Sequence, residues 1–164
     1  MMTFVAVFVL AIALWLLSDY LKGSPIDVQS STEPGKVYEV RLKKLTCTCP
    51  DYKQRATMYE HGELGRICKH LQKALLEADA IRDPAQKAAI ADPNSNRHGT
   101  CLTIDGAIAL HNESRGWFNV YTPDSDGDIK RYGFQLAERR WARKEVPPNG
   151  EHIASVIVEA MEEG

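Results

Sequence analysis

The chain has 164 residues, which is room for one ordinary domain or two small ones. Apolar residues make up 44% and charged residues 26%, so a folded core is expected and wholesale disorder is excluded. The formal net charge of −2 excludes a histone-like polycation. The charge is nevertheless uneven: residues 36–82 hold 10 Lys/Arg and 6 Asp/Glu (net +4), and residues 100–164 hold 7 and 11 (net −4). An anionic partner is therefore expected to contact the first of these regions.

The amino terminus is strongly apolar. Residues 4–17 are almost unbroken hydrocarbon, and the stretch reaches about 20 residues if Tyr20 and Leu21 are included, the low end of what a bilayer-spanning helix needs. Three interpretations compete. A cleaved signal peptide would require a basic residue before the apolar run and small residues at the cleavage site. A buried core helix would not need to be apolar on every face. A single membrane anchor over residues 1–21 fits best, with Trp15 and Tyr20 as interfacial residues.

The first positive charges follow this segment, beginning with Lys22. By the positive-inside rule, the soluble part is expected to face the cytoplasm. Residues 22–35 are rich in Gly, Ser and Pro and lack apolar periodicity, which predicts a linker.

The next region, residues 36–82, is predicted to start with two extended segments. Residues 36–42 alternate in polarity like a strand, and a second short extended piece covers residues 44–49. Residues 52–67 form an excursion. A helix begins near residues 68–70, because apolar residues recur at helical spacing from Leu71 to Ile81.

Three cysteines and a histidine fall on these elements at ligand spacing. In an extended chain, Cys47 and Cys49 point to the same side, and Cys68 and His70 stand at the helix start, after 18 intervening residues. Three thiolates and one imidazole suit a tetrahedral Zn²⁺ ion with no open position, a structural arrangement. Iron–sulfur clusters usually take four cysteines. The alternative of incidental buried cysteines is disfavoured by the spacing, and an exposed loop position is favoured over a ligand role for His61.

The motif resembles the SWIM-type zinc finger. The segments Leu45-Thr-Cys-Thr-Cys-Pro-Asp-Tyr52 and Cys68-Lys-His-Leu-Gln-Lys-Ala-Leu75 match its Cys-x-Cys and Cys-x-His pattern, with a β-hairpin that leads into a helix. The resemblance covers residues 37–76 and has a long gap between the ligand pairs. It implies zinc binding and a role in protein–protein or nucleic-acid contacts, and it does not imply catalysis.

The remainder divides into a helix with a connector (residues 83–99) and a small α+β module (residues 100–164). Asp83 and Pro84 are an N-cap and a first helical residue for a helix over residues 84–91. Four short strands are predicted at residues 100–104, 107–110, 117–121 and 129–134, followed by a helical turn at residues 138–143. Asp105 and Gly106 predict a tight turn, and a closing helix has an apolar face from Ile153 to Met161. The predicted fold class is α+β: a membrane helix, a ββα zinc finger with an extended helical segment, and a meander covered by a terminal helix.

Three further features of this half bear on function. Residues 124–128 are rich in Asp but lack the full pattern of a calcium loop, so a solvated hairpin tip is favoured. Aromatic residues interleaved with arginines could stack nucleic-acid bases, but a core role is favoured. Cys101 is expected to be a small core residue, although a thiol-dependent enzyme that uses Cys101 with His98 or His111 stays open as the alternative function.

The sequence therefore predicts a membrane-tethered, zinc-stabilised interaction module and no enzyme. Its partner is a protein or a nucleic acid, with no small-molecule substrate evident. The zinc finger would present the helix of residues 69–80 and the loop of residues 53–66 to this partner. The candidate contact residues are the basic residues of the zinc region: Lys43, Lys44, Lys53, Arg55, Arg66, Lys69 and Lys73.

Overall fold

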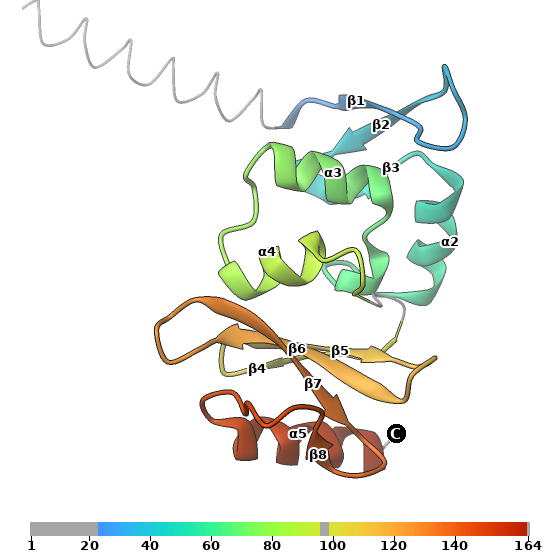
Figure 1. Ribbon diagram of the computed structural model, residues 1–164. Coiled ribbons are helices and arrows are strands. Elements are labelled where there is room, and N and C mark those ends of the chain that lie inside the picture. The colour runs from blue at the N-terminus through green and yellow to red at the C-terminus, as the bar shows by residue number, and fades with distance from the viewer. Residues whose placement is uncertain (1–22, 96–98, 164) are drawn as a thin grey trace, which may run out of the picture.

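The computed structural model describes residues 23–95 and 99–163, and in these residues the chain is α+β with two antiparallel sheets and four α-helices (Figure 1). The first sheet has the order β1-β2-β3 and the second is a meander with the order β4-β5-β6-β7-β8. The strands are β1 (Ile26–Gln29), β2 (Val37–Arg41), β3 (Thr46–Cys47), β4 (Cys101–Ile104), β5 (Ala107–Asn112), β6 (Trp117–Pro123), β7 (Ile129–Gln135) and β8 (Arg140–Trp141). The helices are α2 (Pro50–Met58), α3 (Lys69–Glu77), α4 (Pro84–Ala91) and α5 (Gly150–Glu162), with short 3-10 helices η1 (Leu42–Lys44) and η2 (Leu64–Arg66).

The predicted linker of residues 22–35 contains a strand, which corrects the sequence-based prediction. β1 pairs antiparallel with β2 and places Val28 opposite Tyr38. Val28 is only 5% exposed and is the one buried side chain among the four residues of β1, so it anchors the strand. The surrounding Gly, Ser and Pro residues hide so short a pattern in the sequence.

The second extended piece is shorter than predicted. Leu42 to Lys44 form the 3-10 helix η1, and Leu45 takes a left-handed conformation (φ 48°) before β3, which has two residues. The predicted excursion holds helix α2, which the sequence reasoning missed. Pro50 at its first position is well placed for a helix start, since proline lacks the N–H that would be unpaired there.

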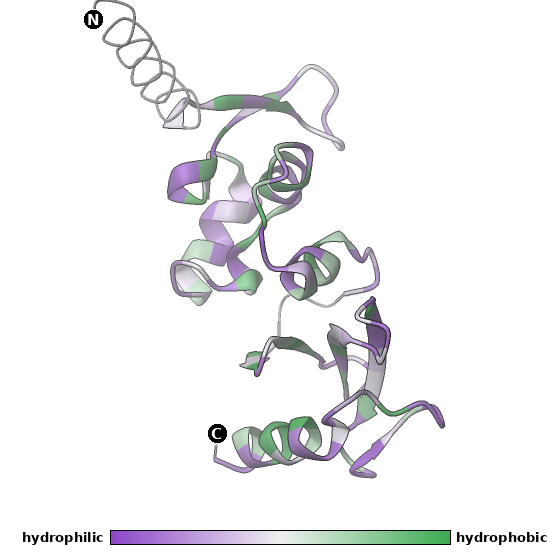
Figure 2. Ribbon diagram, turned by 90° about the vertical axis from the view of Figure 1, so that its left-hand side faces the viewer, coloured by the Kyte–Doolittle hydropathy of each residue, from purple (hydrophilic) through white to green (hydrophobic). Residues whose placement is uncertain are grey.

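The meander of β4 to β8 is buried on both faces. Ile108, Leu110 and Tyr121 face α4 and share a core with the first region, whereas Ala109, Phe118 and Val120 share a second core with α5. Figure 1 shows α4 above this sheet and α5 below it. In Figure 2, α5 carries much of the hydrophobic colour of this half. Helix α4 itself was predicted, but its packing on this sheet was not, because its apolar residues are mostly small alanines.

The detailed elements of this half agree closely with the sequence. Helix α4 has the predicted bounds, and the Asp83 side chain accepts a hydrogen bond from the Gln86 amide as an N-cap. Asp105 and Gly106 both have positive φ (46° and 82°), as a tight hairpin turn requires. The predicted helical turn at residues 138–143 is wrong: the segment makes a turn and then pairs as β8 with β7.

The membrane assignment needs correction. The predicted anchor of residues 1–21 lies outside the described residues, and no helix in the described part of the chain is long and apolar enough to cross a bilayer. The prediction rested on hydropathy and flanking charge alone, which do not show that a folded helix forms. The membrane-spanning element and the cytoplasmic placement derived from it are therefore not retained.

Candidate metal centre

The four predicted ligands come together in the first region. Cys47, Cys49, Cys68 and His70 each offer one ligand atom, and these atoms all lie within 4.8 Å of one another. The edges of a tetrahedral zinc site are about 3.5–3.8 Å, given Zn–S and Zn–N bonds of about 2.3 and 2.0 Å. Side-chain movements of about 1 Å would thus close the cluster around one ion. All three cysteines are buried, with Cys68 fully so.

Two short segments position these residues. Cys47 pairs with Val40 across β2 and β3, and Val40 has no exposed surface. Beyond β3, the Thr48 amide donates to the Glu39 carbonyl (3.0 Å) and the Thr48 hydroxyl accepts from the Glu39 amide (3.0 Å). The backbone amide and the hydroxyl of Thr48 are therefore both fixed to β2. The flanking Cys47 and Cys49 thus keep the same-side orientation that the sequence predicted.

Cys49 and Cys68 occupy equivalent positions at the starts of two helices. Cys49 is the N-cap of α2, where its sulfur accepts from the Tyr52 amide (3.3 Å), and Cys68 is the N-cap of α3, where its sulfur accepts from the Leu71 amide (3.4 Å). Backbone N–H donors and the positive end of a helix favour a thiolate over a thiol. Each helix start thus offsets part of the rise in pKa that burial and the neighbouring cysteines cause for its sulfur.

His70 supplies the observation that points most directly to a metal. Both its ring nitrogens are buried and have no hydrogen-bond partner in the described part of the chain. Burial lowers the pKa of His70, which favours the neutral imidazole that metals bind. An unpaired buried ring nitrogen is costly, and a bound cation would satisfy one of the two.

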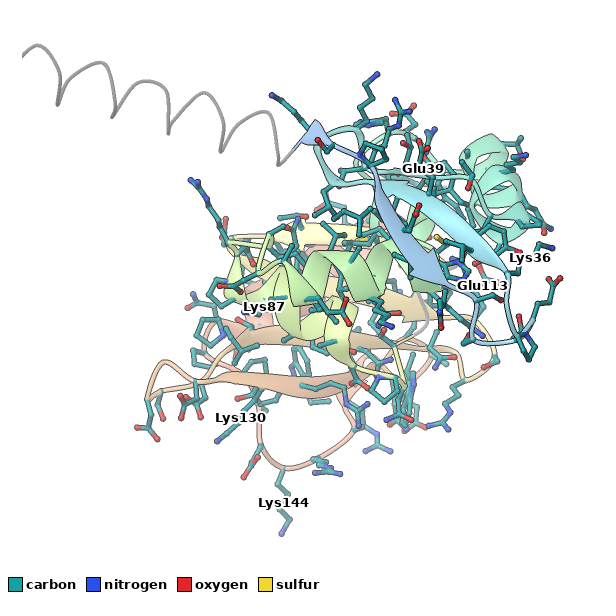
Figure 3. The ribbon with its side chains drawn as sticks, turned by 90° about the horizontal axis from the view of Figure 1, so that it is seen from above. Lys36, Glu39, Lys87, Glu113, Lys130 and Lys144 are labelled. Atoms are coloured by element: carbon teal, nitrogen blue, oxygen red, sulfur yellow. The ribbon has the colours of Figure 1, made fainter. Side chains whose placement is uncertain are left out.

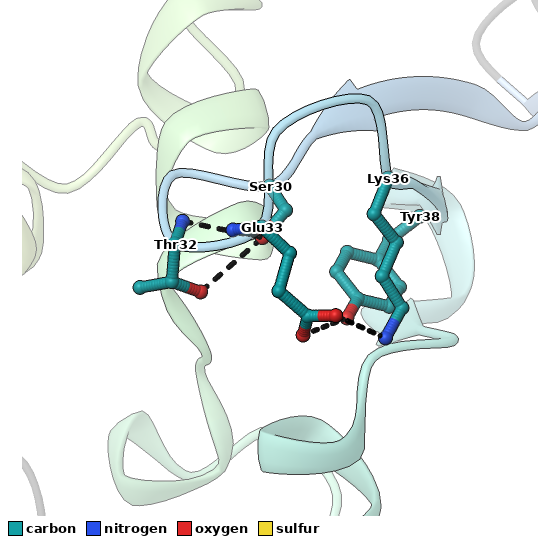
Figure 4. Close-up of polar contacts among 5 residues, drawn as sticks. All are labelled: Ser30, Thr32, Glu33, Lys36 and Tyr38. Atoms are coloured by element: carbon teal, nitrogen blue, oxygen red, sulfur yellow. Dashed lines mark hydrogen bonds and ion pairs between the residues drawn. The ribbon is translucent and has the colours of Figure 1, made fainter.

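Tyr38 packs its ring against the imidazole of His70, a role that the sequence did not predict. Its ring lies 4.7 Å from the His70 ring, centroid to centroid, at an angle of 50°. Figure 4 shows how the hairpin loop orients Tyr38: Glu33 accepts from Lys36 (2.8 Å) and from the Tyr38 hydroxyl (3.5 Å). The available sequence signal was that Tyr38 shares a strand face with Val40, the cross-strand partner of Cys47.

The electrostatics of the sulfurs fit a cation. A hydrogen bond from Cys68 lowers the pKa of Cys47, whereas burial raises the pKa of Cys49. Sharing that proton with Cys47, followed by burial, raises the pKa of Cys68 well above its ordinary value. Three thiolates so close together cannot all be charged without a cation between them. The donor set, the unpaired imidazole and the spacing therefore fit a Cys3His metal site, with zinc as the ion that such ligands suit best.

Two predicted contact residues instead hold the loop between the ligand pairs. The buried Arg55 donates to Asp51 (2.9 Å) and to the Gly65 carbonyl (2.9 Å). Arg66 donates to the Tyr52 hydroxyl (3.1 Å) and the Tyr59 carbonyl (3.2 Å). Both arginines lie within the fold and act on its geometry. The other five predicted contact residues are exposed: Lys43, Lys44, Lys53, Lys69 and Lys73.

The remaining chemically reactive residues lie away from this cluster. His61 is exposed and its Nε2 lies 2.9 Å from the Lys44 carbonyl oxygen, as expected for a loop histidine. Cys101 is partly buried against the core, and burial raises its pKa to about 11, which keeps the thiol protonated at neutral pH. His111 stacks on Phe118, with ring centroids 4.7 Å apart, and His98 lies outside the described residues. These observations count against a thiol nucleophile at Cys101.

The other two features of the second half have structural roles. Asp124 accepts from the amides of Asp126 (2.9 Å) and Asp128 (3.0 Å) and pairs with Lys130 (2.6 Å), which makes the acidic segment a hairpin tip. Four of the six aromatic side chains considered for base stacking are buried in the cores: Phe118, Tyr121, Tyr132 and Phe134. The core interpretation of the aromatic residues is therefore confirmed for these four.

No protein-family model, curated protein or solved structure matches this chain. The chemistry of the site thus carries the assignment.

Proposed function

We propose that the chain is a SWIM-type zinc finger protein in which Cys47, Cys49, Cys68 and His70 hold one structural zinc ion, and that the surface built around this ion is an interaction module. The cluster of three buried sulfurs with an unpaired imidazole carries the proposal. Four protein ligands leave no coordination position for a substrate, so the ion's role is to shape a surface.

The charge of this surface favours an anionic partner. Lys44, Lys53 and Lys69 are exposed, and none of them forms an ion pair with another described residue. The buried stripe of α3 (Leu71, Ala74 and Leu75) faces the core, so this helix presents its polar side outward. Exposed lysines on a folded zinc module fit the phosphates of a nucleic acid or the acidic side chains of a protein.

Metal analysis of the purified full-length chain tests the zinc assignment. We expect about one zinc per chain, a ratio set by the one four-ligand cluster found among the described residues. His70→Ala should lower the zinc content, and His61→Ala is its matched control because His61 is an exposed histidine of the same region. A chain that holds no zinc, or an equal loss in both variants, would contradict the assignment.

The pH dependence of metal affinity gives a second test. In the metal-free protein, the raised pKa values of Cys49 and Cys68 mean that these thiols carry protons at neutral pH. Metal binding must release these protons, so affinity should fall as pH falls, by about tenfold per pH unit for each proton released. Competition with a coloured chelator at several pH values measures this slope, and a flat profile would exclude thiolate ligands.

Salt dependence separates the two partner classes. Binding to nucleic acid through lysines releases counterions, so the affinity for a duplex or single strand should fall steeply as salt rises. Lys69→Ala should weaken this binding. Lys87→Ala in α4 is the control, since that lysine pairs with Asp79 outside the zinc cluster. Salt-insensitive binding, or nucleic-acid binding that survives Lys69→Ala unchanged, would count against a nucleic acid as the partner.

A further inference from the structure

A pocket of about 370 Å³ opens beside the second sheet, away from the metal cluster. Three arginines line it from three separate segments: Arg115 from the turn between β5 and β6, Arg131 from β7, and Arg143 from the segment after β8. We call it the arginine pocket. Its size falls within the range of small-molecule sites. It also gathers cations in the half of the chain that carries a net charge of −4.

Two of the three guanidinium groups are not neutralised. Arg131 pairs with Asp92 (2.9 Å), which also accepts from the Tyr121 hydroxyl. Within the described residues, neither Arg115 nor Arg143 has an ion pair, and Glu145 is the acidic residue that lines the pocket. With Glu145 and Asp92 subtracted from the three arginines, the pocket keeps an excess of one positive charge. The face is therefore built for an anion.

The floor of the pocket offers neutral donors. Asn119 of β6 is only 5% exposed and lines the pocket with its side-chain amide group. Trp117, two residues earlier on the same face of β6, has a buried indole N–H that lacks a partner in the described chain. The Arg115 guanidinium lies 5.5 Å from the centre of the Trp117 ring, so the arginine is held near these donors. The buried N–H of Trp117 therefore needs a partner, which a ligand bound in the pocket can supply.

Gly133 keeps the pocket open. It faces Asn119 across β6 and β7, and a Cβ at this position would lie 3.3 Å from the Ala142 side chain and 4.0 Å from Trp117. Any larger residue would push into the space between them. The absence of a side chain at Gly133, the buried Asn119 and the two arginines without an ion pair therefore belong to one concave feature.

We propose that the arginine pocket binds a small oxyanion, namely the phosphate or carboxylate group of a small molecule. The planar guanidinium groups of Arg115 and Arg143 match two oxygens of such a group, and Asn119 adds an N–H donor from beneath. This site is separate from the proposed zinc centre and does not depend on it.

Titration of the full-length chain with inorganic phosphate, and separately with succinate, tests the proposal at constant ionic strength. The indole N–H signal of Trp117, assigned with Trp117→Phe, reports binding by NMR. We expect a saturable shift with at least one probe, and the preferred probe tells a phosphate site from a carboxylate site. Failure of both probes to give a saturable shift would overturn the proposal, as would binding of long polyanions alone.

Arg143→Ala should weaken the binding of the preferred probe by about tenfold or more, because it removes a charge-assisted bidentate contact. Lys144→Ala is the matched control: it removes the same charge from the next residue, which points away from the body of the protein in Figure 3 and does not line the pocket. Its affinity should stay within about twofold of the unmodified chain. An equal loss of affinity in both variants would mean that only the overall positive charge matters, which would contradict the proposal.

Asn119→Asp gives an independent check, since it keeps the shape of the side chain and places a carboxylate on the pocket floor. Binding should be lost while the thermal unfolding curve, recorded by circular dichroism, still shows a folded chain. Unchanged binding by this folded variant would exclude Asn119 and the pocket floor from the site.

Discussion

The two sheets of this protein are stabilised by different means. The strands β1, β2 and β3 have 4, 5 and 2 residues, and the core beneath them includes three cysteines. The strands β5, β6 and β7 have 6, 7 and 7 residues, and their sheet is packed with apolar side chains on both faces. The first sheet alone is too short to be stable, because two- and three-stranded units need further packing. The second sheet is stabilised by the burial of apolar side chains on both of its faces.

This difference shows why the ligands stand where they do. Cys47 ends β3, Cys49 caps the start of α2 and Cys68 caps the start of α3, so one ion would fix these three element ends together. In the second region no such tie is needed, since adjacent strands follow one another through short turns. Removing the ion and removing apolar surface should therefore damage different parts of the molecule.

Chelation of the metal should have the largest effect. Structural zinc in small fingers contributes about 10 kcal/mol or more to folding, so its loss should unfold the first region. Hydrogen exchange measured by mass spectrometry should show lost protection in residues 37–77. Protection in β6, β7 and α5 should largely remain. Cys101→Ser is the control and should exchange like the unmodified chain; a fully protected metal-free protein would contradict the structural role of the ion.

Removing apolar side-chain atoms from the core beneath α5 should have the next largest effect on stability. This effect should fall on the second sheet. Ile157 has no exposed surface, and Ile157→Ala should lower the free energy of unfolding by about 2–5 kcal/mol through lost apolar contact and a cavity. Zinc content should not change, which separates the two means of stabilisation. Loss of zinc in this variant, measured by metal analysis after purification, would show that the two sheets are not stabilised by separate means.

The loop between the ligand pairs should give the smallest effect. Arg55→Ala leaves Asp51 and the Gly65 carbonyl without their donor and should cost about 1.5–3 kcal/mol in a urea unfolding curve. Lys53→Ala is the matched control on the same helix, since it removes the same charge from an exposed position and should cost less than about 0.5 kcal/mol. Equal effects would mean that Arg55 acts by charge alone.

The sequence predicted those elements whose local signals were strong. The bounds of α4 followed from Asp83 and Pro84, and the meander followed from alternating strands and a two-residue turn at Asp105. The four ligand positions were predicted by spacing on a strand and a helix start, and the structure brings them together. These are short-range patterns, so a single sequence contains them.

Other features depend on contacts between distant segments and could not be predicted. β1 depends on Val28 meeting Tyr38 across the hairpin, and the packing of Tyr38 on His70 joins residues 32 positions apart. Arg55 looked like a surface cation until its bond to Gly65 placed it inside the loop. The arginine pocket joins three segments of the second half, whose overall acidity hid it.

Helix α4 links the two halves through a single shared core. Ala89 and Ile90 are buried in the same cluster as Cys68 on one side and Leu110 on the other, and Gln72 of α3 donates to the Ile90 carbonyl (2.6 Å). Thermodynamic linkage makes such a connection reciprocal. Coupling of this kind is confined to the α4 face of the meander, because the α5 face belongs to a separate core. Of the two faces, the α4 face is thus the one through which binding to the second half could alter the affinity for the metal.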